Sequence, residues 1–330
     1  MIILGIETSC DDTCVAVVED GHRILAGKTM SQHHVHSPYG GVVPELASRT
    51  HQENILPLYR EVMEASGISL SDVDGIGVTY APGLIGALLV GVSFAKALSF
   101  SNNIPLIGIH HIESHIYASL LENPQIPFPH IALVISGGHT CAYRVDSIGN
   151  YSLLGQTLDD AAGEAFDKVG KFLGLSYPGG PAIEKSALEW KGDLVKLPRP
   201  CRDKAECCWS FSGLKTAVMN AMKDGNYTVE QMSSSFQIAV VDILVEKTLI
   251  AAKKEEVKFI TCSGGVAANT FLRKELSERA KKMNIETVFP QKSLCTDNAA
   301  MVAGLAFHKL DHVSDYSLNP IASMPLGCKH

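Results

Sequence analysis

The sequence contains the same short pattern twice, about 130 residues apart. An apolar run, Ile2–Ile6, leads into a polar turn, Glu7–Asp12, and a second apolar run follows directly. The pattern returns where Ile131–Ile135 leads into Ser136–Thr140 and another apolar run. Short apolar runs bounded by polar turns are typical of buried strands. The sequence therefore predicts an α/β protein with two similar halves, each opening with a strand, a polar turn and a strand.

Further strands and helices alternate along both halves. Strands are expected over 75–79, 104–109 and 259–262, and helices over 40–60, 84–99, 111–122, 159–173 and about 270–282. The prolines at 124, 127 and 129 form a stiff connector between the halves. We therefore expect an N-terminal lobe of residues 1–125, a C-terminal lobe of residues 126–297, and a helix at about 298–325 that packs back on the first lobe.

Composition and charge exclude several classes of protein. With 46% hydrophobic and 19% charged residues, the chain is not a disordered or low-complexity protein. A net charge of −7 argues against a broad basic surface for nonspecific binding of nucleic acid. Local basic clusters are still open to RNA, although ordinary solvated faces are the alternative. The candidates are Arg199, Arg202, Lys204, Arg279, Lys281 and Lys282.

The cysteines and the N-terminus indicate a cytoplasmic protein. Nine cysteines occur without any C-x-x-C pair, which favours reduced thiols. No signal-peptide pattern fits the first residues. The uncharged stretch Gly75–Ala95 has the length of a membrane span, but Pro82 and Gly83 interrupt it. We expect a buried strand, a turn and a helix there, and no association with a membrane.

Two glycine-rich turns follow predicted strands, at Ser136–Gly138 and at Ser263–Gly265. Such a turn presents several backbone N–H groups, and a following helix adds its N-terminal dipole, so together they can bind phosphate. One turn of this kind would be explained by chain geometry alone. Two of them, in corresponding parts of the two halves, favour a nucleotide site.

His111 and His115 are four residues apart on a predicted helix. This spacing places both imidazoles on one helix face, where they can chelate a metal, although solvated or capping histidines are the alternative. The loop Cys295–Asn298 contributes a carboxylate, Asp297, at the start of an alanine-rich helix. Two imidazoles and one carboxylate leave coordination positions open. The sequence alone does not bring Asp297 to the histidines.

A group of carboxylates, Asp159, Asp160, Glu164 and Asp167, precedes Glu184 in the second half. Carboxylates of this kind can accept hydrogen bonds from ribose hydroxyls. A solvated helix face is the alternative.

Ten motifs occur in the order expected for one known family. They are Gly5–Asp11, Gly40–His51, Pro82–Gly91, the pair His111 and His115, Ser136–Thr140, Leu158–Asp167, Tyr177–Pro181, Phe211–Thr216, Gly264–Asn269 and Cys295–Asn298. From Gly5 to about Ala303 the chain resembles the bacterial-type catalytic subunit of tRNA threonylcarbamoyladenosine synthase (tRNA N6-adenosine threonylcarbamoyltransferase), once labelled O-sialoglycoprotein endopeptidase.

The resemblance implies the actin/sugar-kinase/Hsp70-like ATPase fold, with two lobes around a central cleft. It implies transfer of threonylcarbamoyl from threonylcarbamoyl-adenylate to N6 of the adenosine 3′ of the anticodon in ANN-decoding tRNAs, at a metal-assisted site in that cleft. By the same resemblance, His111, His115 and Asp297 would hold one divalent metal, Fe²⁺ or Zn²⁺. The implied protein partners are a dimerising paralogue and a small ATPase. The residues implied to hold the adenylate are Val134, Ile135, Ser136, Gly137, Gly138, Asp167, Gly180, Glu184 and Asn269.

The chain departs from the family pattern at two places. Archaeal and eukaryotic relatives carry a tyrosine before the Ser-Gly-Gly turn that can reach the metal, whereas this chain has Val134 and Ile135. Asp12 stands where many bacterial members have glutamate. We therefore assign the role of proton acceptor in the reaction to Asp11.

Two other functions were weighed against the transferase. A metallopeptidase of the H-E-x-x-H type needs a glutamate directly after the first histidine, where this chain has Ile112. A non-catalytic partner subunit with the same ATPase fold has no need of three metal ligands. Both alternatives are weaker than the transferase.

Overall fold

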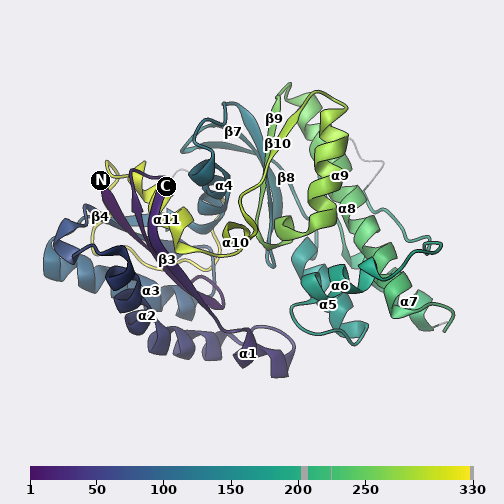
Figure 1. Ribbon diagram of the computed structural model, residues 1–330, viewed down its shortest axis with the longest axis horizontal. Coiled ribbons are helices and arrows are strands. Elements are labelled where there is room, and N and C mark those ends of the chain that lie inside the picture. The colour runs from purple at the N-terminus through teal and green to yellow at the C-terminus, as the bar shows by residue number, and fades with distance from the viewer. Residues whose placement is uncertain (202–206, 224, 328–330) are drawn as a thin grey trace. The chain divides into compact units, whose positions relative to one another are not determined.

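The computed structural model describes residues 1–201, 207–223 and 225–327 (Figure 1). The chain divides into two compact units. Unit 1 comprises Met1–Ile126 together with the residues from Asp297 onward, and unit 2 comprises Pro127–Thr296. Each unit contains a five-stranded sheet with helices packed on it.

The sheet of unit 1 has the strand order β3-β2-β1-β4-β5. Its strands are β1 (Ile2–Glu7), β2 (Asp12–Glu19), β3 (Arg23–Ser31), β4 (Gly75–Ala81) and β5 (Leu106–His110). The first three are antiparallel neighbours, and β4 and β5 continue the sheet parallel to β1.

Helices pack on this sheet according to which side chains each strand presents. The helices of unit 1 are α1 (His33–His36), α2 (Pro44–Ser66), α3 (Ile85–Asn102), α4 (His111–Glu122) and α11 (Ala299–Phe307), with short 3₁₀ turns at Ser37–Tyr39 and Leu70–Asp72. Leu4 and Ile6 of β1 share a core with residues of α2 and α3. The alternate residue Gly5 points the other way, and a Cβ there would lie 2.2 Å from the carbonyl oxygen of Ala299 in α11. Gly77 of β4 meets α11 in the same manner. These two glycines let α11 lie directly on the sheet.

The sheet of unit 2 repeats that topology, with the order β10-β9-β6-β7-β8. Its strands are β6 (His130–Ile135), β7 (Thr140–Ser147), β8 (Asn150–Gln156), β9 (Phe259–Ser263) and β10 (Glu286–Val288). Again three antiparallel strands are followed by two parallel ones. The prediction of two similar α/β halves is confirmed.

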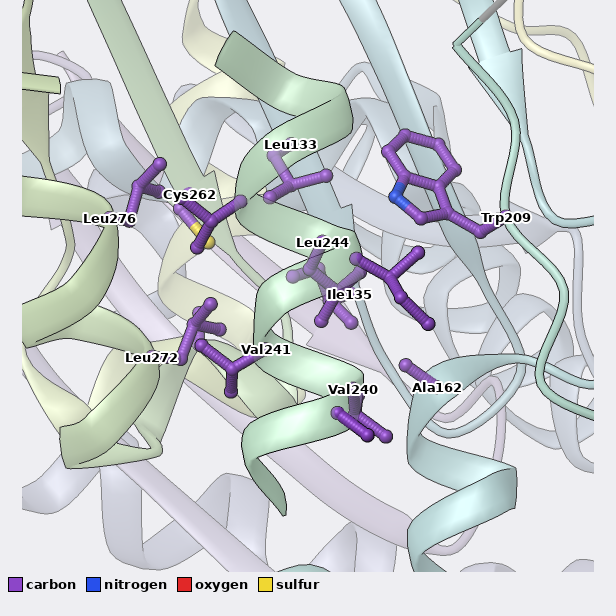
Figure 2. Close-up of a cluster of buried hydrophobic side chains, with 14 of the residues drawn as sticks. Leu133, Ile135, Ala162, Trp209, Val240, Val241, Leu244, Cys262, Leu272 and Leu276 are labelled. Carbon is purple, nitrogen blue, oxygen red and sulfur yellow. The ribbon is translucent and has the colours of Figure 1, made fainter. Parts of the chain in front are cut away.

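The core of unit 2 lies between its sheet and its longest helix. The helices of this unit are α5 (Ala162–Phe172), α6 (Gly179–Leu188), α7 (Ser212–Lys223), α8 (Val229–Lys254), α9 (Thr270–Lys281) and α10 (Lys292–Cys295), with a 3₁₀ turn at Gly265–Ala268. Val240, Val241 and Leu244 of α8 belong to the same buried cluster as Leu133 and Ile135 of β6 (Figure 2). All five side chains are fully buried.

The C-terminal part of the chain differs from the expected long helix over 298–325. Helix α11 ends at Phe307, where the apolar run of the sequence ends, and no helix covers residues 308–327. These residues form a C-terminal strap over unit 1. Ser314 donates a backbone hydrogen bond to Leu106 of β5, and Ile321 donates one to Tyr80 of β4. The strap therefore pairs with backbone groups that the sheet leaves open.

The uncharged stretch at Gly75–Ala95 forms β4, a turn at Pro82–Gly83 and the start of α3, as predicted. Among the described residues, α3 is the one helix long and apolar enough to cross a membrane by length and composition. Core helices of proteins outside membranes pass the same test, so the indication is weak.

Candidate functional site

Three predicted metal ligands lie together within unit 1. Helix α4 begins directly after β5 and carries His111 and His115 in its first two turns. Asp297 directly precedes Asn298, the N-cap of α11. The Nε2 atoms of His111 and His115 lie 3.6 and 3.1 Å from the same oxygen, Oδ1 of Asp297. The three candidate ligand atoms all lie within 4.8 Å of one another, an arrangement that could hold a metal ion.

His111 is further held by Glu7, which sequence reasoning missed. Its Nδ1 lies 3.0 Å from Oε2 of Glu7 and 3.1 Å from Oγ of Ser9. Burial alone would lower the pKa of His111, but the carboxylates of Glu7 and Asp297 raise it to about 9. The sequence does contain a signal for this role of Glu7: a carboxylate stands at the end of an apolar strand, and a buried charge at that position is costly unless it is paired.

The charges around the three ligands fit a divalent cation. Asp12 is largely buried, and burial together with the carboxylates of Asp297 and Asp11 raises its pKa to about 7. Two imidazoles and a carboxylate suit iron or zinc, and a bound cation would neutralise this excess of negative charge. The donor set and its surroundings thus fit the expected metal.

Asp11 and Asp12 occupy different environments in the polar turn between β1 and β2. The side chain of Asp11 is 14% exposed, and its Oδ2 lies 4.0 Å from Nε2 of His33 in α1. Oδ1 of Asp12 is buried and has no hydrogen-bond partner in the part of the chain that the structure describes. Oδ2 of Asp11 is likewise buried and has no hydrogen-bond partner among the described residues, so what distinguishes Asp11 is the neighbouring imidazole of His33.

The motif Pro82–Gly91 supports this polar turn. Thr8 donates a hydrogen bond from Oγ1 to the carbonyl of Ala87, and the backbone N–H of Leu84 donates to the carbonyl of Ser9. A Cβ on Gly91 would lie 2.3 Å from Oγ1 of Thr8. The small residues of the motif allow α3 to approach the turn that carries Glu7 and Asp11.

In unit 2, the Ser-Gly-Gly turn after β6 forms as expected. The backbone N–H of Ser136 donates to the carbonyl of His139, and Oγ of Ser136 accepts from the N–H of His139. A Cβ on Gly137 or Gly138 would meet no atom within 4 Å, so space is open above both residues. Val134 and Ile135 lie inside β6 with fully buried side chains, which leaves only their backbone for a ligand.

The remaining predicted nucleotide residues connect the helices of unit 2. Oδ1 of Asp167 in α5 accepts from the N–H of Gly179, at the start of α6, and Gly180 has open space beside it. Oε1 of Glu184 in α6 accepts from the N–H of Thr270, at the start of α9. Asn269 is the N-cap of α9, accepting from the N–H of Leu272 and donating to Gln237 of α8. These contacts link α5, α6, α8 and α9 through the predicted residues.

Asp159, Asp160 and Glu164 contact other protein groups of unit 2. Asp159 accepts from the backbone N–H of Phe211 and from hydroxyls that flank it. Asp160 pairs with Lys168 and Lys215, and Glu164 also pairs with Lys168. Their oxygens anchor α7 and pair with lysines, and the hypothesis that they accept hydrogen bonds from ribose stays a prediction.

The basic residues considered for RNA are also partly engaged. Arg199 and Arg279 both pair with Asp242, at 3.0 and 2.6 Å. Arg202 and Lys204 lie outside the described residues. The two arginines are held in one ion-pair network of unit 2, so they are weak candidates for contacts with phosphate.

Comparisons with known proteins agree with the predicted family and fold. The family model described as tRNA N6-adenosine threonylcarbamoyltransferase matches residues 23–304. A protein of that name from Fusobacterium nucleatum is 50% identical over 98% of both chains, and one from Trichlorobacter lovleyi is 48% identical over 99% of this chain and 97% of its own.

Similar solved structures have low sequence identity. HypF of T. kodakarensis superposes with a TM-score of 0.63 at 15% identity, covering 94% of this chain and 47% of its own. The activator of the 2-hydroxyisocaproyl-CoA dehydratase from Clostridium difficile, with bound ADPNP, gives a TM-score of 0.57 at 15% identity, covering 94% and 96%. At this identity the likeness concerns the fold alone, and it confirms the predicted actin/sugar-kinase/Hsp70-like class.

Proposed function

Because the chain belongs to the tRNA N6-adenosine threonylcarbamoyltransferase family, we propose that it takes threonylcarbamoyl from threonylcarbamoyl-adenylate and transfers it to N6 of an adenosine in tRNA. The acceptor is the adenosine 3′ of the anticodon in ANN-decoding tRNAs. The observation that carries the proposal is the convergence of His111, His115 and Asp297 in a chain about half identical to named transferases over nearly its whole length.

The proposed metal ligands are the Nε2 atoms of the two histidines and a carboxylate oxygen of Asp297. Iron and zinc both accept two imidazoles and one carboxylate. Bound there, either metal would supply Lewis-acid chemistry toward a carbonyl or phosphate oxygen. The short distances to Asp297 and the surrounding carboxylates support this assignment.

Unit 2 is proposed to bind the adenylate. The backbone N–H groups of Gly137 and Gly138 would receive the phosphate, with Ser136 and the backbone of Val134 and Ile135 beside it. The open space over both glycines supports this role. The other residues proposed for this site are Asp167, Gly180, Glu184 and Asn269.

The proposed reaction forms a bond between the carbamoyl carbon and N6, breaks the bond from that carbon to the adenylate oxygen, and releases AMP. A proton must leave N6 in the process. Asp11 is the proposed acceptor, because its carboxylate is partly exposed in the polar turn of unit 1. Asp12 is the weaker candidate, since it stands where many bacterial members of the family have glutamate.

The metallopeptidase alternative has little support. Glu113, the glutamate two residues after the first histidine in the sequence, is buried and its Oε2 pairs with Lys309 of the strap. A carboxylate engaged in this way is poorly suited to activating water. A non-catalytic role is contradicted by the relatives, which are named as transferases.

Protein partners are proposed because tRNA is a polyanion and the chain carries a net charge of −7. A dimerising paralogue and a small ATPase subunit would supply the positive surface that this chain lacks. The proposed location of the reaction is the cytoplasm. The direct test is a transfer assay with threonylcarbamoyl-adenylate and an ANN-decoding tRNA, with and without these subunits. Modified adenosine detected by mass spectrometry supports the function; release of glycopeptides without tRNA modification would overturn it.

Replacing Asn269 is expected to weaken adenylate binding. In Asn269→Ala, the lost hydrogen bond to the adenylate is expected to cost about 1–3 kcal/mol of binding free energy. The variant also removes the N-cap of α9 and the buried partner of Gln237, which lowers the stability of the site. The matched variant Asn269→Ser keeps a capping oxygen but not the amide. Calorimetry with a nonhydrolysable adenylate analogue measures the effect. Equal affinity in the wild type and Asn269→Ala would remove this residue from the site.

A further inference from the structure

Glu7, at the end of β1, is a buried carboxylate with an unusually complete set of donors. Its side chain is fully buried. Oε1 accepts from the backbone N–H of Ser9, and Oε2 accepts from Oγ1 of Thr79 at 2.6 Å. The same Oε2 lies 3.0 Å from Nδ1 of His111. Three segments, β1 with its turn, β4 and α4, therefore converge on one carboxylate.

These contacts determine which ring nitrogen of His111 carries the proton. Ser9 and Thr79 act as donors to Glu7, so its oxygens are acceptors. Nδ1 of His111 must then donate. When a metal displaces the proton of the other nitrogen, Nε2, that nitrogen presents its lone pair on the side where Asp297 lies 3.6 Å away. His115 has no such support, because its Nδ1 has no hydrogen-bond partner among the residues described here.

We propose that Glu7 is a positioning residue of the metal site: it holds His111 as the Nδ1–H tautomer, aims Nε2 at the metal, and adds a negative charge behind that ligand. The inference rests on the proposed metal site. Partners of this kind orient metal-bound histidines, and their removal typically lowers metal affinity 10–100-fold. Glu7 makes His111 the rigid ligand of the pair and leaves His115 the more adaptable one.

A purely structural ion pair between Glu7 and His111 is the competing explanation. It predicts a loss of stability on substitution, without a specific effect on the metal. Glu113 offers a matched comparison, since it is a buried carboxylate on α4, between the two histidines in sequence, and it pairs with Lys309 instead of a ligand. Like Glu7→Gln, Glu113→Gln replaces a buried carboxylate by an amide, but it does so on α4 and without removing a contact to His111.

The experiment uses the full chain, stripped of metal and titrated with Co²⁺, whose visible absorption reports coordination. We expect Glu7→Gln to bind Co²⁺ 10–100-fold more weakly with an altered spectrum, and Glu113→Gln to stay within about threefold of the wild type. Equal affinity and an identical spectrum for Glu7→Gln would overturn the proposal. A wild type that binds no Co²⁺ would instead contradict the metal site itself.

A second measurement needs no variant and covers the case in which Glu7→Gln fails to fold. NMR of ¹⁵N-histidine-labelled wild type loaded with Zn²⁺ distinguishes the two tautomers of each imidazole. The proposal requires a proton on Nδ1 of His111 and the metal on its Nε2. A metal-bound Nδ1, or a proton on Nε2, would refute it.

Discussion

His115→Ala is expected to lose the bound metal and to transfer threonylcarbamoyl more than about a hundredfold more slowly than the wild type. His115 is fully buried, and its Nε2 lies 3.1 Å from Oδ1 of Asp297. Losing a supporting residue behind a ligand typically costs 10–100-fold in metal affinity or activity, so losing a ligand itself should cost more. Elemental analysis of the purified variant, followed by the transfer assay with partner subunits, measures both effects.

The control for this experiment is the neighbouring His110, which faces away from the metal ligands. Its Nε2 contacts the carbonyl of Met324 in the strap, and its Nδ1 accepts from the N–H of Ile112. His110→Asn keeps a capping group at the start of α4 and should retain the metal. Wild-type metal content in folded His115→Ala would disprove the assignment.

The second large effect is on folding. Gly5→Ala is expected to lower the free energy of unfolding by about 3 kcal/mol or more, because the new Cβ would lie 2.2 Å from the backbone carbonyl of Ala299 and 2.8 Å from Ala303. Neither neighbour can rotate away, so α11 would have to leave the sheet. Urea unfolding followed by circular dichroism measures the loss.

Gly27→Ala is the matched control, since Gly27 also lies in a strand of unit 1. A Cβ there would meet Ala16 at 3.4 Å, an ordinary contact. We expect a change of less than about 1 kcal/mol for this variant. Equal stability of Gly5→Ala and Gly27→Ala would show that α11 does not depend on the glycine.

The sequence predicted the two histidines of the candidate metal site as a pair, but it could not show that Asp297 and Glu7 lie beside them. The spacing of His111 and His115 depends on local helix geometry, which a sequence displays directly. Asp297 is 182 residues beyond His115, and its approach depends on α11 packing on Gly5 and Gly77. The role of Glu7 could not be predicted either, because it depends on the position of the start of α4 relative to the end of β1.

The fold was predicted where apolar runs are bounded by polar or glycine-rich turns, as at β1 and β6. Helix α8 was missed, because most of its faces are buried and its apolar residues therefore show no helical period. Strands β3 and β8 were missed for the opposite reason, since each lies at a sheet edge and is largely exposed.

The discontinuity of unit 1 constrains the order of events during synthesis. A ribosome adding about 5–20 residues per second needs roughly 10–40 s to proceed from His115 to Asp297. Throughout that interval, the emerging chain has both histidines but lacks the carboxylate, and the sheet face over Gly5 lacks α11. Unit 2 is one continuous segment of the chain, so it can fold before the last part of unit 1 has been synthesised. A chain truncated before Asp297 would therefore release a finished unit 2 attached to an unfinished metal site.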